Sequence, residues 1–466
     1  MYNYIGYLEY DFCVPKNKDY LGKGIIMKHI IWNKEMECMP RKEMEALQLE
    51  RLKAIVDYCD RNVEFYHNRL SKAGVTADKI KTLSDVQYIP YTTKTDLRDT
   101  YPFGMFSVPQ SKLVRIHASS GTTGNPTVVG YTREDLDNWS EQVARVAVAS
   151  GATEETIVQI CFGYGMFTGA LGLHYGLEKI GATVVPTSSG NTEKQLKFMR
   201  DFKTNAIVAT PSYCLYLAEA ARERANEFPM EMYNSLKLGI LGSEGCTPEM
   251  RQQISDRWGN GFFSTDNYGM SELNGPGMSG ECLLRDGLHI SEDHYLCEII
   301  DSSTGEVLPK GSTGELVVTA LTKRGIPMLR YRTKDITNIN YEPCACGRTT
   351  ARMHKIIGRS DDMLKVRGVN VFPSQIESAL IGVNEISPHY QLVVRREGFS
   401  DTLEVRVELI DGSLLERFSE LEALQKNIHY RIKSILGIEI KVTLVEPKTI
   451  ERFTGKAQRV VDLRNK

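Results

Sequence analysis

Apolar and polar positions along the chain follow two periods, which predict a protein built from both helices and strands. Over residues 41–73, leucine, isoleucine and valine recur about every 3.6 residues among glutamate, lysine and arginine, and this pattern predicts an amphipathic helix. Thr132 followed by Asp135 has the spacing of a capping box. It predicts the start of another helix, which continues through Ala149 and ends at Gly151.

Between residues 157 and 226, short apolar segments alternate with segments of helical pattern. The apolar segments are 157–162, 183–186 and 206–210, and the helical ones are 171–179, 193–202 and 215–226. This βαβ alternation predicts a largely parallel sheet covered by helices. Residues 313–321 and 328–340 are expected to form antiparallel strands that close the same large domain.

Beyond Asp361 the pattern starts again. Segments 391–395, 404–410 and 439–445 predict strands, and segment 419–436 predicts a helix. These elements suit a small α+β domain of about a hundred residues, within the usual range of domain sizes. The expected fold is therefore α/β, with a large N-terminal part of several subdomains and mixed sheets, followed by a small C-terminal α+β domain.

Composition excludes several classes of protein. Of 466 residues, 25% are charged and the formal net charge is −2, so neither nucleic acid nor a membrane surface is expected as a partner. No apolar run is long enough to span a bilayer, and the first residues lack the pattern of a secretory signal. The ten cysteines are scattered, which favours reduced thiols and a cytoplasmic location.

The segment with the clearest chemistry is Ser119-Ser120-Gly121-Thr122-Thr123-Gly124, which has four hydroxyls and two glycines. Glycine tolerates positive φ, so successive backbone N–H groups can point at one anion while the hydroxyls add further donors. Strand-like segments precede and follow the loop, and it does not end in Gly-Lys-Ser/Thr, so it is not a Walker loop. It predicts a binding site for the phosphates of ATP.

Four further motifs follow this loop in a fixed order. They are Tyr268-Gly269-Met270-Ser271-Glu272, Tyr331-Arg332-Thr333-Lys334-Asp335, the segment 358–373 that begins Gly358-Arg359-Ser360-Asp361, and Thr454-Gly455-Lys456. With the loop, they resemble the adenylate-forming superfamily of acyl-CoA synthetases, peptide-synthetase adenylation domains and luciferases, over roughly residues 30–466. The segments 31–33, 162–169 and 367–373 are most similar to the phenylacetate-CoA ligase group.

The resemblance implies a division of the chain and a set of nucleotide contacts. It implies an N-terminal extension over residues 1–28, an adenylation domain over 29–360 and a mobile C-terminal domain over 361–466. Residues 119–124 would hold the β and γ phosphates, and Thr123 would be one of the catalytic groups. Glu272 would bind Mg²⁺. Further nucleotide contacts are implied for Glu244, Tyr268, Gly269, Met270, Ser271, Asp335 and Arg359, with Tyr268 on the adenine and Asp335 on the ribose hydroxyls.

Two reactions share one pocket in this superfamily, which implies a moving part. Lys456 resembles the lysine that bridges the substrate carboxylate and the α-phosphate during adenylation. Asp361 resembles the hinge about which the small domain then turns. The strand that carries Lys365 and Gly368 would afterwards face the adenylate, where Gly368 lets the thiol arm of coenzyme A pass close to the backbone.

The acyl pocket is expected between aromatic and glycine-rich segments. By resemblance it is lined by Tyr164, Phe167, Ile240, Gly242, Ser243, Glu244 and Pro248. Such a slot suits a flat aryl acid, although the same aromatic side chains could equally belong to the core.

Four residues predict a structural zinc site. Cys344 and Cys346 form a tight pair on a turn, and Cys282 and His289 form a second pair with six residues between them. Four nitrogen and sulfur ligands complete a tetrahedral site. His294 and Cys297 are rival ligands for the same position. A nucleic-acid-binding zinc ribbon is disfavoured, because the chain has no basic excess.

The expected activity is ATP-dependent ligation of an arylacetic acid, with phenylacetate favoured, to coenzyme A through an acyl-adenylate, releasing AMP and pyrophosphate. The expected partners are ATP, Mg²⁺, an aryl acid and coenzyme A, with a homodimer as a further candidate assembly. Alternatives are an adenylating enzyme for indoleacetate, a benzoate-type acid or a cofactor acid, a P-loop kinase or ATPase yielding ADP, and a nucleotide-binding protein without catalysis.

Overall fold

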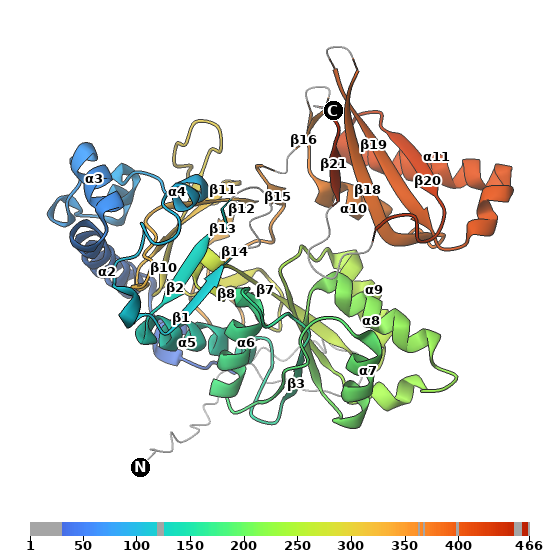
Figure 1. Ribbon diagram of the computed structural model, residues 1–466, viewed down its shortest axis with the longest axis horizontal. Helices are drawn as coiled ribbons and strands as arrows, with labels where there is room; N and C mark the ends of the chain where they lie inside the picture. Colours follow the sequence, from blue (N-terminus) through green and yellow to red (C-terminus); the bar gives the residue numbers. More distant parts are fainter. Residues whose placement is uncertain are drawn as a thin grey trace.

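The computed structural model describes residues 30–118, 125–361, 364–366, 369–397, 400–451 and 459–464 (Figure 1). Several of the residues singled out by sequence lie outside the described residues. They are residues 1–28, Ser119, Ser120, Gly121, Thr122, Thr123, Gly124, Gly368, Lys456 and the side chain of Lys365. None of the described helices is long and apolar enough to cross a membrane.

The N-terminal helices differ from the predicted pattern in one respect. Helix α1 spans Lys34–Glu37, α2 spans Arg41–Asn62 and α3 spans Glu64–Ala73, so the single helix expected over 41–73 is in fact two. The break is at Val63, which has extended backbone angles (φ −131°, ψ 107°) and a buried side chain. Packing Val63 into the core turns the chain, and the 3.6-residue period resumes immediately afterwards.

A nine-stranded sheet forms the centre of the large domain. Its order is β13-β14-β9-β8-β7-β6-β5-β3-β4. The strands span Ile339–Asn340, Arg352–Met353, Leu288–Ile290, Gly275–Glu281, Phe263–Met270, Leu238–Gly242, Ala206–Ala209, Ile157–Ile160 and Thr183–Val185, in that order. Strands β3, β4, β5, β6 and β7 pair in parallel. Strand β8 pairs antiparallel with β7, and β9, β14 and β13 extend the sheet through further antiparallel pairs. The sheet is therefore mixed, and only its parallel part, formed by β3 to β7, matches the predicted βαβ alternation.

Helices cover this sheet because each carries an apolar stripe. They are α5 Arg133–Ala149, α6 Thr168–Lys179, α7 Thr192–Asp201, α8 Pro211–Glu223 and α9 Pro248–Trp258. The predicted capping box at α5 is present, since Thr132 and Asp135 exchange side-chain and backbone hydrogen bonds. In the chain, helix α4 (Lys94–Asp99) and the antiparallel hairpin of β1 (Arg115–Ala118) and β2 (Val128–Tyr131) follow the N-terminal helices and precede α5.

A second sheet of the large domain has the order β10-β11-β12-β15. Its strands span Tyr295–Ile300, Gly314–Ala320, Tyr331–Thr337 and Gly358–Arg359 and are antiparallel. The antiparallel pair expected from residues 313–321 and 328–340 is present, but the second strand ends at Thr337. Residues 339–340 instead join the nine-stranded sheet as β13, so this segment connects the two sheets.

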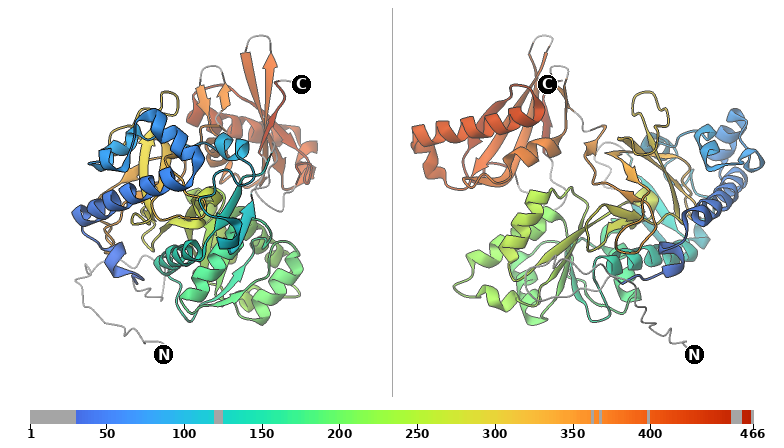
Figure 2. Two further views of the ribbon diagram at one scale, coloured as in Figure 1. Left: turned by 60° about the vertical axis from the view of Figure 1, so that its left-hand side comes forward. Right: turned by 180° about the vertical axis from the view of Figure 1, so that it is seen from behind.

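The C-terminal part has a core of its own, formed by residues between 364 and 460. The hairpin β16 (Leu364–Val366) and β17 (Val369–Val371) is followed by α10 (Pro373–Leu380), and α11 (Phe418–Leu436) packs on a four-stranded sheet of order β20-β19-β18-β21. These strands span Lys441–Val445, Ser400–Leu409, Ile386–Glu397 and Val460–Asp462. Figure 2 shows this part, in orange and red, beside α8 and α9 of the large domain. Ile381 packs against the apolar cluster to which α8 and α9 contribute.

Candidate functional site

Three residues of the predicted nucleotide site meet although they come from different strands. Tyr268 lies near the end of β7, and its hydroxyl donates to Asp335 Oδ2 of β12 at 2.5 Å. Arg359 of β15 lies opposite Asp335 in the strand register and donates to Asp335 Oδ1 at 3.0 Å. Burial raises the pKa of Tyr268 well above its usual value, and the neighbouring Asp335 carboxylate raises it further. The phenol therefore stays protonated and remains a donor.

The turn after Tyr268 requires glycine. A Cβ on Gly269 would lie 1.8 Å from the carbonyl oxygen of Gly275, far inside van der Waals contact. The close approach of β7 and β8 brings the short helical turn Ser271–Leu273 next to the site. Ser271 Oγ lies 3.1 Å from Thr168 Oγ1, the first residue of α6.

Glu272 is buried at this turn, with 5% of its surface exposed. The carboxylate lies close enough to Tyr331, which belongs to β12, for its charge to act on that phenol. Burial and the nearby Glu272 charge raise the pKa of Tyr331 well above its usual value. A carboxylate offers the oxygen ligands that Mg²⁺ prefers.

The first predicted acyl segment lies against β1. The carbonyl oxygen of Met166 accepts hydrogen bonds from the N–H of Ala118 at 3.0 Å and from Nδ1 of His117 at 3.1 Å. Met166 and the predicted pocket residue Phe167 have 53% and 54% of their surfaces exposed, so their apolar side chains are available to a ligand. Tyr164, in contrast, is half-buried, and its hydroxyl lies 3.0 Å from His174 Nδ1.

The second predicted acyl segment begins in the core. Ile240 is fully buried within β6, so its side chain contributes to the core between sheet and helices. Gly242 ends this strand, and a Cβ there would lie 2.8 Å from the side-chain nitrogen of Asn267. Only glycine lets the chain pass this close to β7, and the segment that follows can then turn toward the nucleotide site.

Residues 243–248 form the turn from β6 into α9. Ser243 has a positive φ of 68°, which is uncommon for a residue with a side chain and often marks functional turns. Glu244 Oε2 accepts hydrogen bonds from Ser212 Oγ at 2.6 Å and from Ser212 N–H at 3.3 Å. Pro248 is exposed at the first position of α9.

A buried cluster of charges holds this turn. Lys355 Nζ donates to the carbonyl oxygen of Cys246 at 2.8 Å and lies 2.9 Å from Asp266 Oδ2. Arg251 Nη2 bonds both Asp266 and Glu281 at 2.7 Å. Because Lys355 lies just before β15, it connects the acyl segment to the strand that carries Arg359. No motif in the sequence pointed to this cluster.

The predicted hinge residue is bound to the nucleotide site. Arg359 Nε and Nη2 donate to the two carboxylate oxygens of Asp361 at 2.9 and 3.0 Å, while its Nη1 bonds Asp335. Asp361 is exposed and precedes the first strand of the C-terminal core. One guanidinium therefore contacts both the expected ribose ligand and the expected hinge.

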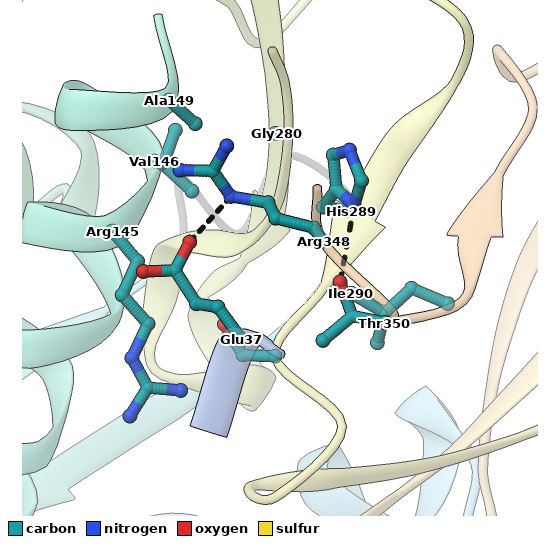
Figure 3. A pocket seen from close by; sticks show the side chains of 10 residues that line it. Glu37, Arg145, Val146, Ala149, Gly280, His289, Ile290, Arg348 and Thr350 are labelled. Carbon is teal, nitrogen blue, oxygen red and sulfur yellow. Dashed lines mark hydrogen bonds and ion pairs between the residues drawn. The ribbon is translucent and has the colours of Figure 1, made fainter. Parts of the chain in front are cut away.

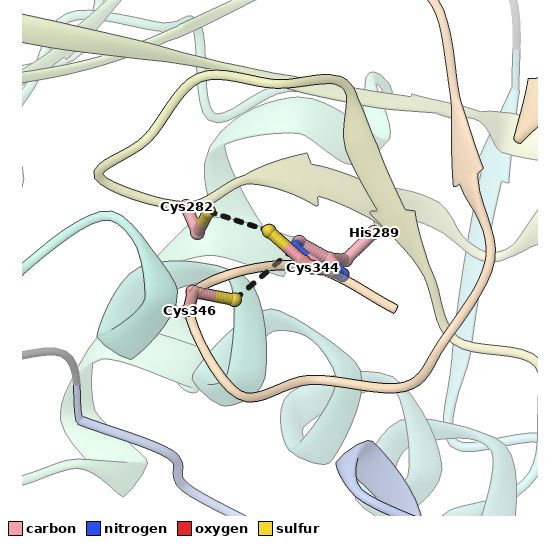
Figure 4. Close-up of side chains that lie close together, drawn as sticks. All are labelled: Cys282, His289, Cys344 and Cys346. Carbon is pink, nitrogen blue, oxygen red and sulfur yellow. Dashed lines mark hydrogen bonds between the residues drawn. The ribbon is translucent and has the colours of Figure 1, made fainter. Parts of the chain in front are cut away.

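The four residues predicted to bind zinc lie together and are buried (Figure 4). Their ligand atoms all lie within 4.8 Å of one another, with Cys282 Sγ 4.0 Å from Cys344 Sγ and Cys346 Sγ 3.5 Å from His289 Nε2. The neighbouring thiols of Cys282 and Cys344 lower the pKa of Cys346. Of the rival ligands, His294 is hydrogen-bonded to Thr322 at 2.7 Å, and neither His294 nor Cys297 belongs to this group.

The N-terminal helix packs beside this cluster (Figure 3). Arg348 is buried between Glu37 of α1, with which it forms an ion pair, and Cys346 Sγ, which lies 3.7 Å from its Nη1. The remaining space, lined by Arg145, Arg348 and His289 among others, measures about 20 Å³, enough for a single water. It is therefore a packing gap and not a substrate site.

Comparison with known proteins agrees with this geometry. The family model for the AMP-binding enzyme matches residues 44–321, and that for the AMP-binding enzyme C-terminal domain matches residues 368–464. The phenylacetate-coenzyme A ligase of Aromatoleum evansii is 49% identical over 434 residues, which cover 92% of this chain and 97% of the relative. That of Thermus thermophilus is 47% identical, covering 93% and 100%.

A solved 2-hydroxyisobutyryl-CoA ligase has the same fold at 28% identity. In its post-adenylation state with 2-HIB-AMP the TM-score is 0.87, covering 96% of this chain and 95% of the other. In its thioesterification state, with coenzyme A also present, the TM-score is 0.68. The chain thus superimposes better on the post-adenylation state. Together with the sequence identities, this assigns the chain to the AMP-binding enzyme family, within the phenylacetate-coenzyme A ligases.

Proposed function

We propose that the protein joins phenylacetate to coenzyme A at the expense of ATP. The carboxylate oxygen attacks the α-phosphorus and pyrophosphate leaves; the thiol of coenzyme A then attacks the acyl carbon and AMP leaves. The observation that carries the proposal is the meeting of Tyr268, Asp335 and Arg359 beside the buried Glu272, within a chain 45–49% identical to four phenylacetate-coenzyme A ligases.

In this proposal each group of the nucleotide site has a task. Asp335 accepts bonds from the ribose hydroxyls, and Tyr268 fixes that carboxylate while its ring lies against the adenine. Glu272 binds Mg²⁺, which neutralises charge on the departing pyrophosphate. The glycine- and hydroxyl-rich loop 119–124 holds the β and γ phosphates, and Lys456 approaches the α-phosphate during adenylation only.

The second half-reaction is proposed to need a rotation at Asp361. Its bidentate ion pair with Arg359 is exposed on the Asp361 side, so water can replace it at little cost. The greater similarity to a post-adenylation structure is consistent with an arrangement that precedes this rotation. After it, the β16–β17 hairpin would carry Lys365 and Gly368 to the adenylate.

The cysteine and histidine cluster is proposed to hold a structural zinc. A tetrahedral site with zinc–sulfur bonds of about 2.3 Å and zinc–nitrogen bonds of about 2.0–2.1 Å has ligand separations of about 3.6–3.8 Å. The distance of 4.0 Å between Cys282 Sγ and Cys344 Sγ and that of 3.5 Å between Cys346 Sγ and His289 Nε2 are close to these values. His289 Nδ1 lies 3.0 Å from Thr350 Oγ1, which orients the ring so that Nε2 faces Cys346 Sγ and would be available to bind zinc.

Phenylacetate is proposed as the acid because the exposed apolar side chains of Met166 and Phe167 suit an aromatic ring. We propose a cytoplasmic location on the ground that the cysteines of the described part are free thiols. Small molecules are the proposed partners, and a homodimer is a candidate assembly.

An acid panel tests the proposal. The purified protein is supplied with ATP, Mg²⁺, coenzyme A and one of phenylacetate, indoleacetate, benzoate or acetate, and AMP and the thioester are measured. We expect phenylacetate to give the highest kcat/KM and AMP as the nucleotide product. If another acid gave a higher kcat/KM, that acid would replace phenylacetate as the proposed substrate. Formation of ADP in place of AMP would exclude an adenylate mechanism.

Lys456→Ala separates the two half-reactions. We expect it to lose most acid-dependent exchange of pyrophosphate into ATP, while it still converts supplied phenylacetyl-AMP and coenzyme A into thioester. The loss of exchange is expected on the order of 10²–10³-fold, by analogy with removal of a donor to transition-state charge. Equal damage to both half-reactions would contradict the role of Lys456.

A further inference from the structure

The turn that carries Glu272 is held by buried side chains that bond its backbone carbonyls. Lys323 Nζ donates to the carbonyl oxygen of Glu272 at 2.9 Å and lies 3.5 Å from that of Ser271. The hydroxyl of Tyr295 donates to the carbonyl of Leu273 at 2.7 Å, and the hydroxyl of Tyr131 to that of Asn274 at 2.9 Å. Among these three donors only Lys323 is an ammonium, and its side chain is 1% exposed.

Burying an ammonium is costly unless nearby groups compensate it. The Nζ of Lys323 lies 5.2 Å from the centre of the Tyr131 ring, and the carboxylates that act on its charge are Asp135 and Glu272. Both carboxylate oxygens of Asp135 already accept hydrogen bonds from backbone N–H groups, and these bonds fix the position of its side chain. The ammonium is therefore directed at the Glu272 turn both by its hydrogen bonds and by its charge.

The backbone that presents Lys323 is itself fixed. Asp135 Oδ1 accepts from the N–H of Arg324 at 2.6 Å and Oδ2 accepts from the N–H of Gly325 at 2.8 Å. Asp135 stands in the first turn of α5, directly after β2, which is the strand that follows the predicted phosphate loop. Hydrogen bonds thus connect Asp135 to the backbone that follows Lys323, and the Lys323 side chain to the carbonyl of Glu272.

We propose that Lys323 is a positioning residue for adenylation, which sets the Glu272 carboxylate for the Mg²⁺ that accompanies ATP. The proposal rests on the proposed function, because the assignment of Mg²⁺ to Glu272 belongs to it. Lys323 does not touch the nucleotide; it acts through the backbone of the turn. Groups that orient a metal ligand in this way commonly change metal affinity or activity about 10- to 100-fold when removed.

Lys323→Met tests the proposal, with Arg324→Met as the matched control. Arg324 is the next residue, and its guanidinium lies 4.7 Å from the Tyr58 ring, away from the Glu272 turn. In pyrophosphate exchange we expect Lys323→Met to raise the half-saturating Mg²⁺ concentration about 10- to 100-fold. Arg324→Met is expected to resemble wild type. Thioester formation from supplied phenylacetyl-AMP should stay close to wild type, because no pyrophosphate leaves in that step and the Mg²⁺ assigned to Glu272 is not needed.

A binding measurement complements the kinetics. ATP should raise the melting temperature of wild type more with Mg²⁺ than with EDTA, and we expect Lys323→Met to lose most of that difference. Lys323→Gln keeps a donor without the charge and replaces the Met variant if that protein does not fold. An unchanged Mg²⁺ response, or equal loss in both half-reactions, would overturn the proposal. Wild type without acid-dependent exchange would instead refute the proposed function.

Discussion

Removal of the Asp335 carboxylate should weaken ATP binding with little effect on the chemical step. Asp335 is 6% exposed, and its two oxygens bond Tyr268 at 2.5 Å and Arg359 at 3.0 Å. In the complex the same oxygens are expected to accept the ribose hydroxyls. Because these bonds exist in the ground state and the transition state alike, Asp335→Ala should raise KM for ATP and leave kcat nearly unchanged.

The size of the effect follows from the bonds exchanged. A hydrogen bond to a charged acceptor contributes about 1.5–3 kcal/mol. Part of the ribose contact replaces bonds already made to Tyr268 and Arg359, so we count one such bond as the net loss. That corresponds to an increase in KM for ATP of about 10- to 150-fold, at 1.4 kcal/mol for each factor of ten.

The assay is acid-dependent pyrophosphate exchange over a range of ATP concentrations, with Tyr268→Phe as the control. Tyr268→Phe removes the phenol bond but leaves the carboxylate, so its effect on KM should be smaller. Asp335→Ala also leaves the Tyr268 hydroxyl without this partner, at a cost in stability on the order of 1–3 kcal/mol, which denaturant unfolding would measure. An unchanged KM, or a fall in kcat alone, would refute the ribose assignment.

Three further outcomes are expected. Purified wild type should contain one equivalent of zinc. The double variant Cys344→Ser/Cys346→Ser should lose both the zinc and thermal stability, whereas the control Cys297→Ser should keep both. Metal-free wild type of full stability would contradict this. Burial lowers the pKa of His294 to about 4, whereas the unfolded chain has about 6.5, so the unfolded state binds more protons between these values. The free energy of unfolding should therefore decrease as pH falls through that range, and His294→Gln should flatten the curve; parallel curves would exclude His294 as the cause. Asp361→Pro fixes φ at the hinge and should retain pyrophosphate exchange while slowing thioester formation, and a normal thioester rate would end the hinge assignment.

Local signals in the sequence were sufficient where a few neighbouring residues decide the backbone. The pair Thr132 and Asp135 correctly predicts the start of α5, because a capping box satisfies the first backbone N–H groups of a helix by itself. The break at Val63 could not be predicted in this way. The apolar period is nearly continuous there, and it is the core that selects where the chain turns.

At the candidate metal site, too, the sequence predicted part of the arrangement and the tertiary structure decided the rest. Residue types and spacing predicted Cys282, His289, Cys344 and Cys346 as zinc ligands but left His294 and Cys297 as rivals. The pairing of β9 with β14 decides between them, since it brings His289 beside the turn that carries Cys346. His294 lies a few residues further on, and its contact with Thr322 turns it away from the cluster.

The sequence by itself was enough to predict the chemistry of this protein, because its glycine- and hydroxyl-rich loop suits phosphate and its ordered motifs resemble those of the adenylate-forming superfamily. Only the tertiary structure decided which of these groups act together. Tyr268 and Asp335 are 67 residues apart and meet through the order of strands in two sheets. Lys323 stands in a loop without a motif, and its bond to the Glu272 turn depends on how α5, β11 and β8 pack. Contacts of this range arise from burial of the whole core, which no local pattern records.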